Sequence, residues 1–226
     1  MDMLCTRINA VFVGSVRPMP GDGRPTGIFK QPVACRVHVG PLGLQGDQQA
    51  DLRVHGGPEK AVHHFPAHNL ARLAQAFPGQ AAQFVAGSMG ENISTAEWDE
   101  STVCIGDEFR MGTARVQLSQ PRSPCWKIDA RHAVEGITLH VHTHGIAGWY
   151  YRVLEEGAVA AGDSLELLRR NPAPVTLRQY WDLIHTHRPG AEQLQRVMDT
   201  PGLAPAIRAR LQQRLQWLRN NGSASR

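Results

Sequence analysis

Alternating apolar and polar positions recur through the first 170 residues and predict a mainly β fold. This period-2 pattern is typical of strands with one buried face and occurs in residues 35–39 and 114–118. Residues 8–16 are β-branched and apolar, and residues 102–109, 149–154 and 164–168 are further short apolar segments, so we expect strands there as well. Residues 102–109 and 115–118 flank Gly112 as a hairpin-like pair. Residues 67–77 differ, because their apolar side chains share one helical stripe that ends at Pro78-Gly79. A helix is therefore expected there.

The pattern changes at Asn171-Pro172-Ala173-Pro174, which is typical of a linker. Beyond it the chain favours three helices, at Leu177–His185 with Thr176 as its cap, at Ala191–Met198 and at Pro205–Asn220. We therefore expect a β domain over residues 1–170 and a three-helix extension over residues 175–221. Such short helices bury little alone, so they should pack on the β domain or on another subunit.

The last predicted helix has four arginines opposite its apolar stripe, at positions 208, 210, 214 and 219. That stripe could face nucleic acid or an acidic partner. We favour a solvated face with the arginine stems packed along it.

The composition is that of an ordinary soluble globular protein, and its charge does not require a nucleic-acid partner. The 226 residues are 42% hydrophobic and 19% charged, with a mild net charge of +4. Basic residues scatter rather than run in blocks. We recognise no signal peptide and no apolar stretch of membrane-spanning length, so the expected location is the cytoplasm.

Four cysteines occur without a C-x-x-C pair, which argues against a zinc knuckle or a thioredoxin motif. Cys5, Cys35 and Cys104 lie in or beside apolar segments and are expected to fill the core. Free thiols in a chain of this length indicate a reducing compartment.

Cys125 is the sharpest chemical candidate. It follows the strand at 114–118 and two prolines that should stop regular pairing, and it lies between Arg122 and Lys127. Neighbouring cations favour the thiolate, which is both a nucleophile and a metal ligand. The alternative is a small apolar residue packed in the core, because free cysteine is often buried.

Other polar candidates are weaker when each is taken alone. His55 precedes paired glycines that let a backbone approach a ligand closely, and His63 and His64 follow soon after. For any single histidine we favour ordinary surface or core hydrogen bonding, and their spacing is not that of a zinc-binding helix pair. Lys30 stands alone among apolar neighbours, and Asn92 lies in a Gly-rich loop.

A further group of histidines, at 140, 142 and 144, would share one face if residues 137–144 formed a strand. Three imidazoles so placed could hold zinc. We favour the simpler interpretation, a polar strand face or a short helix in which the three side chains scatter.

Taken together, six segments resemble the MOSC family, which is named for the C-terminal domain of molybdenum cofactor sulfurases. The closest resemblance is to its YiiM-like branch, which is associated with resistance to 6-N-hydroxylaminopurine. The segments are GIFKQPV (27–33), GDQQADLRVHGG (46–57), EKAVHHFP (59–66), GENIS (90–94), SQPRSPCWK (119–127) and GWYYRVLEEG (148–157). The helical tail is also similar to the extension of that branch.

The resemblance implies a closed, mostly antiparallel MOSC-type β-barrel with a few short helices and a basic cavity. It also implies the molybdenum cofactor, a Mo-molybdopterin, with Cys125 as the catalytic residue and molybdenum ligand. The implied cofactor-binding residues are Lys30, Arg122 and Lys127 for the phosphate, His55, His64 and Asn92 for directional hydrogen bonds, and Lys60. The histidines at 140, 142 and 144 are not part of it.

Two functions follow as hypotheses. The first is molybdenum-dependent reduction, and so detoxification, of N-hydroxylated compounds such as 6-N-hydroxylaminopurine. Because the sequence has no dinucleotide fingerprint and no iron–sulfur spacing, a separate reductase should supply the electrons. The alternative is a non-catalytic carrier that holds the cofactor or a persulfide on Cys125. We expect a small-molecule substrate and no membrane partner, we do not favour nucleic acid, and a homodimer is compatible with the sequence.

Overall fold

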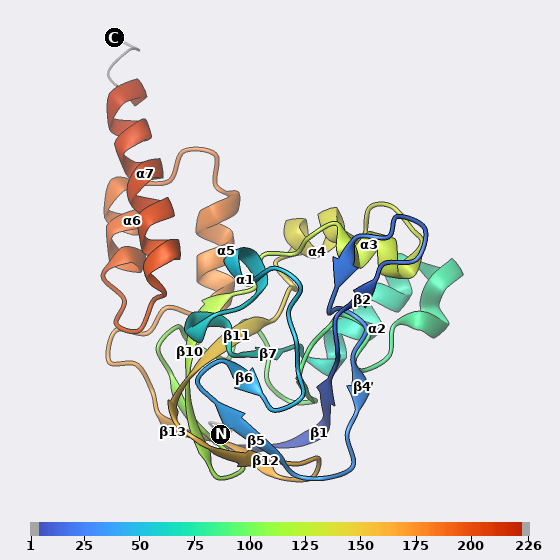
Figure 1. Ribbon diagram of the computed structural model, residues 1–226. Coiled ribbons are helices and arrows are strands. Elements are labelled where there is room, and N and C mark those ends of the chain that lie inside the picture. The colour runs from blue at the N-terminus through green and yellow to red at the C-terminus, as the bar shows by residue number, and fades with distance from the viewer. Residues whose placement is uncertain (1–4, 223–226) are drawn as a thin grey trace.

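A closed β-barrel forms the body of the molecule (Figure 1). The computed structural model describes residues 5–222. Within them, seven strands follow one another in the order β13-β9-β10-β11-β7-β8-β1, and pairing of β1 with β13 closes the ring. The pairing is antiparallel except between β7 and β8. The barrel strands are β1 (Cys5–Val13), β7 (Val62–His64), β8 (Ile93–Thr95), β9 (Glu108–Met111), β10 (Ala114–Pro121), β11 (Trp149–Glu155) and β13 (Ser164–Arg169).

Short strands and helices cover the barrel. Strand β4 (Gln31–Pro32) extends the edge of β1, while β2 (Arg17–Pro18) and β3 (Pro25–Thr26) form a separate hairpin. The remaining small sheet contains β5 (Val37–Gly40), β6 (Gly43–Leu44) and β12 (Gly157–Val159). The helices of this part are α1 (Leu52–His55), η1 (Pro58–Lys60), α2 (Ala67–Ala76), η2 (Pro78–Gln83), α3 (Lys127–His132) and α4 (Ile137–His144).

The longest barrel contact joins β10 to β11, and it follows from their sequences. Val116 and Leu118 alternate with polar residues, so their side chains enter the core while the polar ones face outward. Trp149 and Tyr151 enter the same core from β11 and are fully buried. Burial of each such side chain stabilises the fold by roughly 2 kcal/mol. This pair of strands therefore provides the rigid base for the loop that follows β10.

The three-helix extension is also present, as α5 (Leu177–His185), α6 (Ala191–Met198) and α7 (Pro205–Gly222). Thr176 and Gln179 form a reciprocal capping box at the start of α5, as the sequence predicts. Trp181 of α5 packs against Gly145, where an added Cβ would lie 2.6 Å from the indole. Gly145 also has a φ of 60°, so this close contact requires glycine.

Several sequence predictions can now be compared with the structure. The closed barrel followed by three helices is confirmed. Residues 137–144 form the helix α4 rather than a strand. Cys104 is buried as expected, but Cys5 and Cys35 are exposed, so their assignment to the core was wrong. Cys5 occupies an outward-facing position of β1, whose residues alternate between exposed and buried there, and Cys35 lies in the loop between β4 and β5. The division into domains at residues 170 and 175 stays a prediction, and its residues 1–4 lie outside the described part.

No helix within residues 5–222 has both the length and the apolar character needed to cross a membrane.

Asn171 joins the barrel to the extension. Its side-chain nitrogen donates to the carbonyl oxygens of Ile105 at 2.7 Å and of Pro201 at 2.8 Å, and its side-chain oxygen accepts from the Ala173 amide. The residue is 3% exposed. The linker between the barrel and the extension is therefore held in place by hydrogen bonds.

We predict that Asn171→Ala lowers the free energy of unfolding by about 1–3 kcal/mol, because two buried carbonyl oxygens lose their donor. Urea denaturation monitored by tryptophan fluorescence measures this loss. The exposed Asn220→Ala on α7 is the matched control and should leave the midpoint unchanged. Equal midpoints for the two variants would show that the hydrogen bonds of Asn171 do not contribute to stability.

Candidate functional site

The loop that carries Cys125 begins where the β10–β11 ladder ends. The last paired residues are Pro121 and Trp149, and the Arg122 amide then donates to the carbonyl of Gly148 at 3.0 Å. The carbonyl of Cys125 accepts from the Ile128 amide and from the Thr138 hydroxyl, each at 3.0 Å. Both ends of the loop are therefore fixed by backbone hydrogen bonds. The side chain of Cys125 is half-buried and free.

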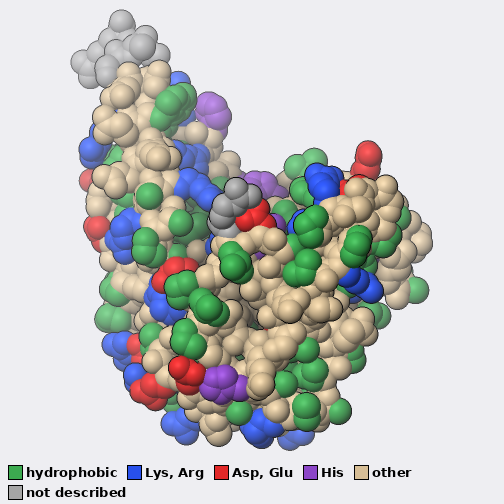
Figure 2. All heavy atoms as spheres, in the orientation of Figure 1, with side chains coloured by type: hydrophobic (Ala, Val, Ile, Leu, Met, Phe, Trp, Pro, Cys, Tyr) green, Lys and Arg blue, Asp and Glu red, His purple; other side chains and the backbone are tan. Residues whose placement is uncertain are grey.

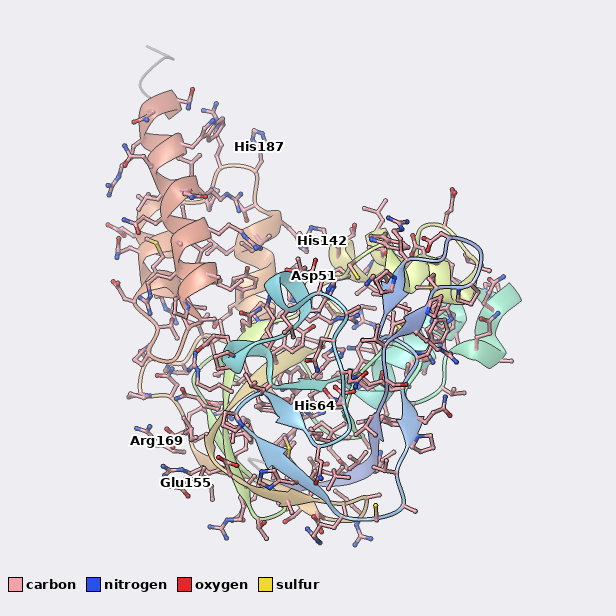
Figure 3. All side chains as sticks on the ribbon, viewed as in Figure 1. Asp51, His64, His142, Glu155, Arg169 and His187 are labelled. Carbon is pink, nitrogen blue, oxygen red and sulfur yellow. The ribbon has the colours of Figure 1, made fainter. Side chains whose placement is uncertain are left out.

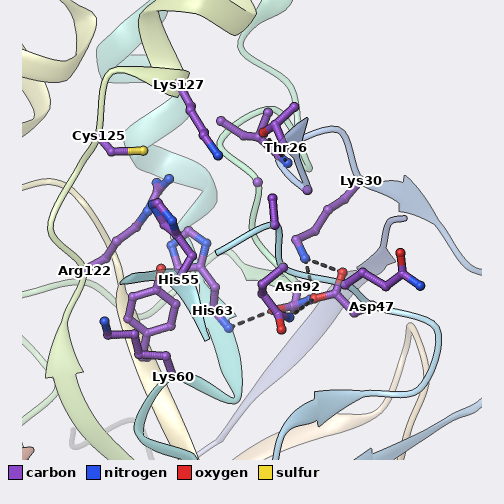
Figure 4. Close-up of a pocket in the computed structure, with 17 residues that line it drawn as sticks. Thr26, Lys30, Asp47, His55, Lys60, His63, Asn92, Arg122, Cys125 and Lys127 are labelled. Atoms are coloured by element: carbon purple, nitrogen blue, oxygen red, sulfur yellow. Dashed lines mark hydrogen bonds and ion pairs between the residues drawn. The ribbon is translucent and has the colours of Figure 1, made fainter. Parts of the chain in front are cut away.

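The thiol of Cys125 opens into a cavity of about 560 Å³, a volume that includes solvent at its mouth (Figure 4). Seven of the eight predicted site residues line it, namely Cys125, Lys30, His55, Lys60, Asn92, Arg122 and Lys127. They come from segments almost 100 residues apart in the sequence. The structure therefore brings together most of the predicted set, while their roles stay predictions.

His64 is the exception, because it lies inside the barrel and not at the cavity (Figure 3). One ring nitrogen lies 3.0 Å from the Tyr151 hydroxyl and the other 2.9 Å from the Thr95 hydroxyl. Its neighbour His63 lines the cavity instead. Successive residues of a strand point to opposite faces, so only one of the two could reach the cavity. The prediction selected the wrong member of the pair.

One end of the cavity holds a buried ion pair between Lys30 and Asp47. Asp47 also accepts hydrogen bonds from the Gly14 amide and from the side chain of Asn92, both at 2.9 Å. Burial lowers the pKa of Lys30, and the Asp47 carboxylate opposes that effect. The charge of Lys30 is therefore balanced within the protein. Asn92 is also occupied, because its oxygen accepts from the His63 amide at 2.9 Å.

The opposite end, beside Cys125, is positively charged. Arg122 is 5% exposed, and its Nη1 has no hydrogen-bond partner among the described residues. The buried Nε2 of His63 likewise lacks a partner there. Lys127 donates from the rim to the carbonyl of Pro25 at 2.9 Å, which holds the β2–β3 hairpin over the cavity. Buried polar atoms are nearly always hydrogen-bonded, so the unpartnered atoms indicate a site for a polar ligand.

The histidines at the cavity are neutral at physiological pH. Burial lowers the pKa of His55 to about 4, with help from the charges of Lys127, Arg122 and Lys60. Burial, together with Arg122, also lowers the pKa of His63 well below its usual value. Burial raises the pKa of Tyr150, against the opposing charge of Arg122, so its hydroxyl keeps its proton. These three side chains can therefore donate or accept hydrogen bonds without adding charge.

Three cavity residues with titratable side chains were not among the predicted site residues. Asp47 appeared only within the segment GDQQADLRVHGG (46–57), although a carboxylate was needed to balance Lys30. Tyr150 lies in the GWYYRV segment, where alternation allowed either tyrosine to face the cavity. His63 was passed over for His64. In each case the sequence contained a suitable residue type, but it did not show whether that side chain faces the cavity.

The three histidines of α4 do not form a metal site. His140 and His144 stack with ring centroids 4.0 Å apart, whereas His142 turns toward Trp181 and His185 of α5. Among residues 5–222, no group of three or more His, Cys, Asp or Glu side chains could hold a metal ion. Of the two interpretations favoured from the sequence, the short helix with scattered histidines agrees with this geometry and the polar strand face does not.

We predict that His64→Ala lowers the free energy of unfolding at pH 7.5 by about 2–4 kcal/mol, because it leaves a cavity and two unpaired hydroxyls. The pH dependence should change too. Burial lowers the pKa of His64 to about 3, so the folded state is penalised as the pH falls below the unfolded value of 6.5. Between pH 6.5 and 5 the wild type should lose about 2 kcal/mol more than the variant.

Urea denaturation at pH 7.5, 6.5 and 5 measures both effects. The exposed His187→Ala, two residues after the end of α5, is the control and should follow the wild type. Equal acid sensitivity of His64→Ala and wild type would contradict the assigned pKa direction.

Comparison with known proteins gives a consistent family. The model of the MOSC domain matches residues 51–166. Protein YiiM of Escherichia coli (strain K12) is 38% identical over 205 residues, which is 90% of each chain. A protein of Gibberella moniliformis named "Reductase" is 32% identical over 162 residues, 71% of this chain but only 28% of that protein.

Solved structures agree. The crystal structure of YiiM from Geobacillus stearothermophilus has a TM-score of 0.79 and 30% identity, covering 93% of this chain and 99% of that one. The fold, the coverage and the identity lead to one conclusion: this chain belongs to the MOSC domain family.

Proposed function

We propose that this protein is a molybdenum-cofactor-dependent oxidoreductase that reduces N-hydroxylated compounds such as 6-N-hydroxylaminopurine. The observation that carries the proposal is the position of Cys125, a half-buried free thiol that opens into a cavity with buried, unpartnered Arg122 and His63 atoms. MOSC domains are associated with binding of the molybdenum cofactor. The name of the fungal relative, "Reductase", supports the reaction class.

The residues present fit this cofactor. A thiol is a soft donor of the kind that suits a transition metal with sulfur ligands. A phosphate needs cations or backbone amides, and Arg122 has an Nη1 group free to donate. Arg122 and Lys127 would therefore hold the phosphate, and Cys125 would hold the metal. Lys30, already paired with Asp47, would keep the inner end of the cavity in shape rather than add net positive charge.

When bound, the cofactor would supply the two-electron chemistry that protein side chains lack. Overall, an N–OH group takes up two electrons and two protons and leaves as N–H and water. The chain contributes binding and orientation. His55 and His63 are neutral and Tyr150 is protonated at pH 7, so all three can make directional hydrogen bonds to a heterocyclic substrate. A separate reductase would supply the electrons.

Activity of purified protein with a chemical reductant tests the proposal. The assay measures molybdenum by elemental analysis and the conversion of 6-N-hydroxylaminopurine to the amine. We expect wild type to turn over and Cys125→Ser to lose at least about 100-fold in kcat, because the thiolate ligand is absent. Cys35→Ser is the control, since that thiol is exposed and does not line the cavity.

Two results would contradict the proposal. One is molybdenum-loaded wild type that leaves the substrate unchanged. The other is Cys125→Ser with the activity of wild type. The carrier alternative predicts a different outcome, a stable sulfur adduct on Cys125 without molybdenum, which native mass spectrometry detects.

A further inference from the structure

A second pair of cations lies where the cavity meets the helical extension. Lys60 of η1 lines the cavity and is half-buried. Arg210 of α7 is exposed and belongs to the extension. Figure 2 shows Lys and Arg side chains on the side of the extension that faces the barrel. Barrel and extension therefore both place positive charge at this junction.

Hydrogen bonds fix the start of α7 beside η1. The Ala204 amide, just before α7, donates to the Ser119 carbonyl of β10 at 2.9 Å. The hydroxyl of the same Ser119 donates to the carbonyl of Glu59 at 2.6 Å, one residue before Lys60. Ser119 thus connects the two segments directly. Arg210 lies less than two helical turns after this anchor, at about 1.5 Å per residue.

The charge of Arg210 affects titratable side chains both in the barrel and in the extension. On the barrel side, burial lowers the pKa of Lys60, and Arg210 lowers it further. On the extension side, burial raises the pKa of Tyr180 of α5, and Arg210 and Arg214 act against that rise. Together with the anchoring of α7 beside η1 through Ser119, this places Arg210 close enough to Lys60 and Tyr180 for its charge to act on both.

No carboxylate balances these two cations. Within residues 5–222, neither Lys60 nor Arg210 forms an ion pair, and the nearest acid in sequence, Glu59, is paired with Arg152. Lys60 donates only to the carbonyl of Val54, at 2.6 Å. Other arginines of α7 are engaged, since Arg208 and Arg214 donate to backbone carbonyls. Two unpaired cations on neighbouring segments, one of which lines the ligand cavity, are suited to an anion.

We propose that Lys60 and Arg210 bind the phosphate of a purine nucleotide whose base occupies the cavity. This inference rests on the proposed function and narrows the substrate class, from N-hydroxylated bases to N-hydroxylated nucleoside monophosphates. Guanidinium and ammonium groups together match a phosphate dianion, and the guanidinium can donate two parallel hydrogen bonds. Arg122 and Lys127, next to Cys125, remain for the phosphate of the cofactor.

Calorimetric binding to the purified full-length protein tests the site without turnover. The probes are adenosine 5′-monophosphate and adenosine. We expect the nucleotide to bind about tenfold more tightly, and Arg210→Gln to abolish this preference. Arg219→Gln is the control, because it removes the same charge from α7 about 13 Å farther along the helix, and it should keep the preference.

A kinetic arm compares kcat/KM for 6-N-hydroxylated adenosine monophosphate with that for the free base. The ratio should fall in Arg210→Gln and not in Arg219→Gln. Equal values for nucleotide and base in the wild type, with the base still reduced, would overturn the phosphate site and leave the proposed function standing. Nucleotide preference that depends on Arg210, without any reduction, would support the site and contradict the function.

The same two cations could also hold the phosphate of a nucleotide-extended cofactor. Acid treatment of purified wild type, followed by chromatography, separates the two sources. Release of a stoichiometric purine or pyrimidine nucleotide would overturn the substrate assignment. Release of none, together with the binding preference, would support it.

Discussion

The buried carboxylate of Asp47 collects donors from separate segments of the chain. Lys30 precedes β4, the Gly14 amide follows β1, and the Asn92 amide precedes β8. A buried charge is tolerated only when it is paired and hydrogen-bonded, and removing one partner typically costs about 3–5 kcal/mol. These loops therefore have one low-energy arrangement, in which they form the inner end of the cavity. Because Lys30 is balanced there, the net positive charge of the cavity comes from elsewhere.

The positive charge of the cavity comes from two pairs of cations. Arg122 and Lys127 belong to the Cys125 loop, which the β10–β11 ladder and Thr138 hold in place. Lys60 and Arg210 lie farther out, and Ser119 links their segments. Ser119 is itself part of β10, so one strand positions both pairs of cations. Hydrogen bonds of Ser119 and Asn171 thus fix the extension to the barrel beside the segment that carries Lys60.

The sequence was sufficient where a local pattern determines structure. Strands with clear alternation, the Thr176 cap and the three C-terminal helices were all predictable, because each depends on neighbours within a few residues. The sequence was insufficient where a shift of one residue in strand register decides whether a side chain faces the core or the cavity. His63 and His64 are chemically identical, and a shift of one position in a strand exchanges core for cavity. The sequence identified Arg210 only as one of four arginines on the last helix. Its proposed role depends on Lys60, which is 150 residues earlier in the chain.

The geometry around Cys125 also bears on the choice between enzyme and carrier. A thiol that passes sulfur to another protein must be reached by a second thiolate or acceptor group, which favours an exposed position. Cys125 is instead half-buried, and it shares its cavity with a protonated tyrosine and two neutral histidines. Carrying sulfur requires none of these groups. A heterocyclic ligand that must be oriented would use all of them, so the arrangement favours a small molecule brought to the sulfur over sulfur delivered outward.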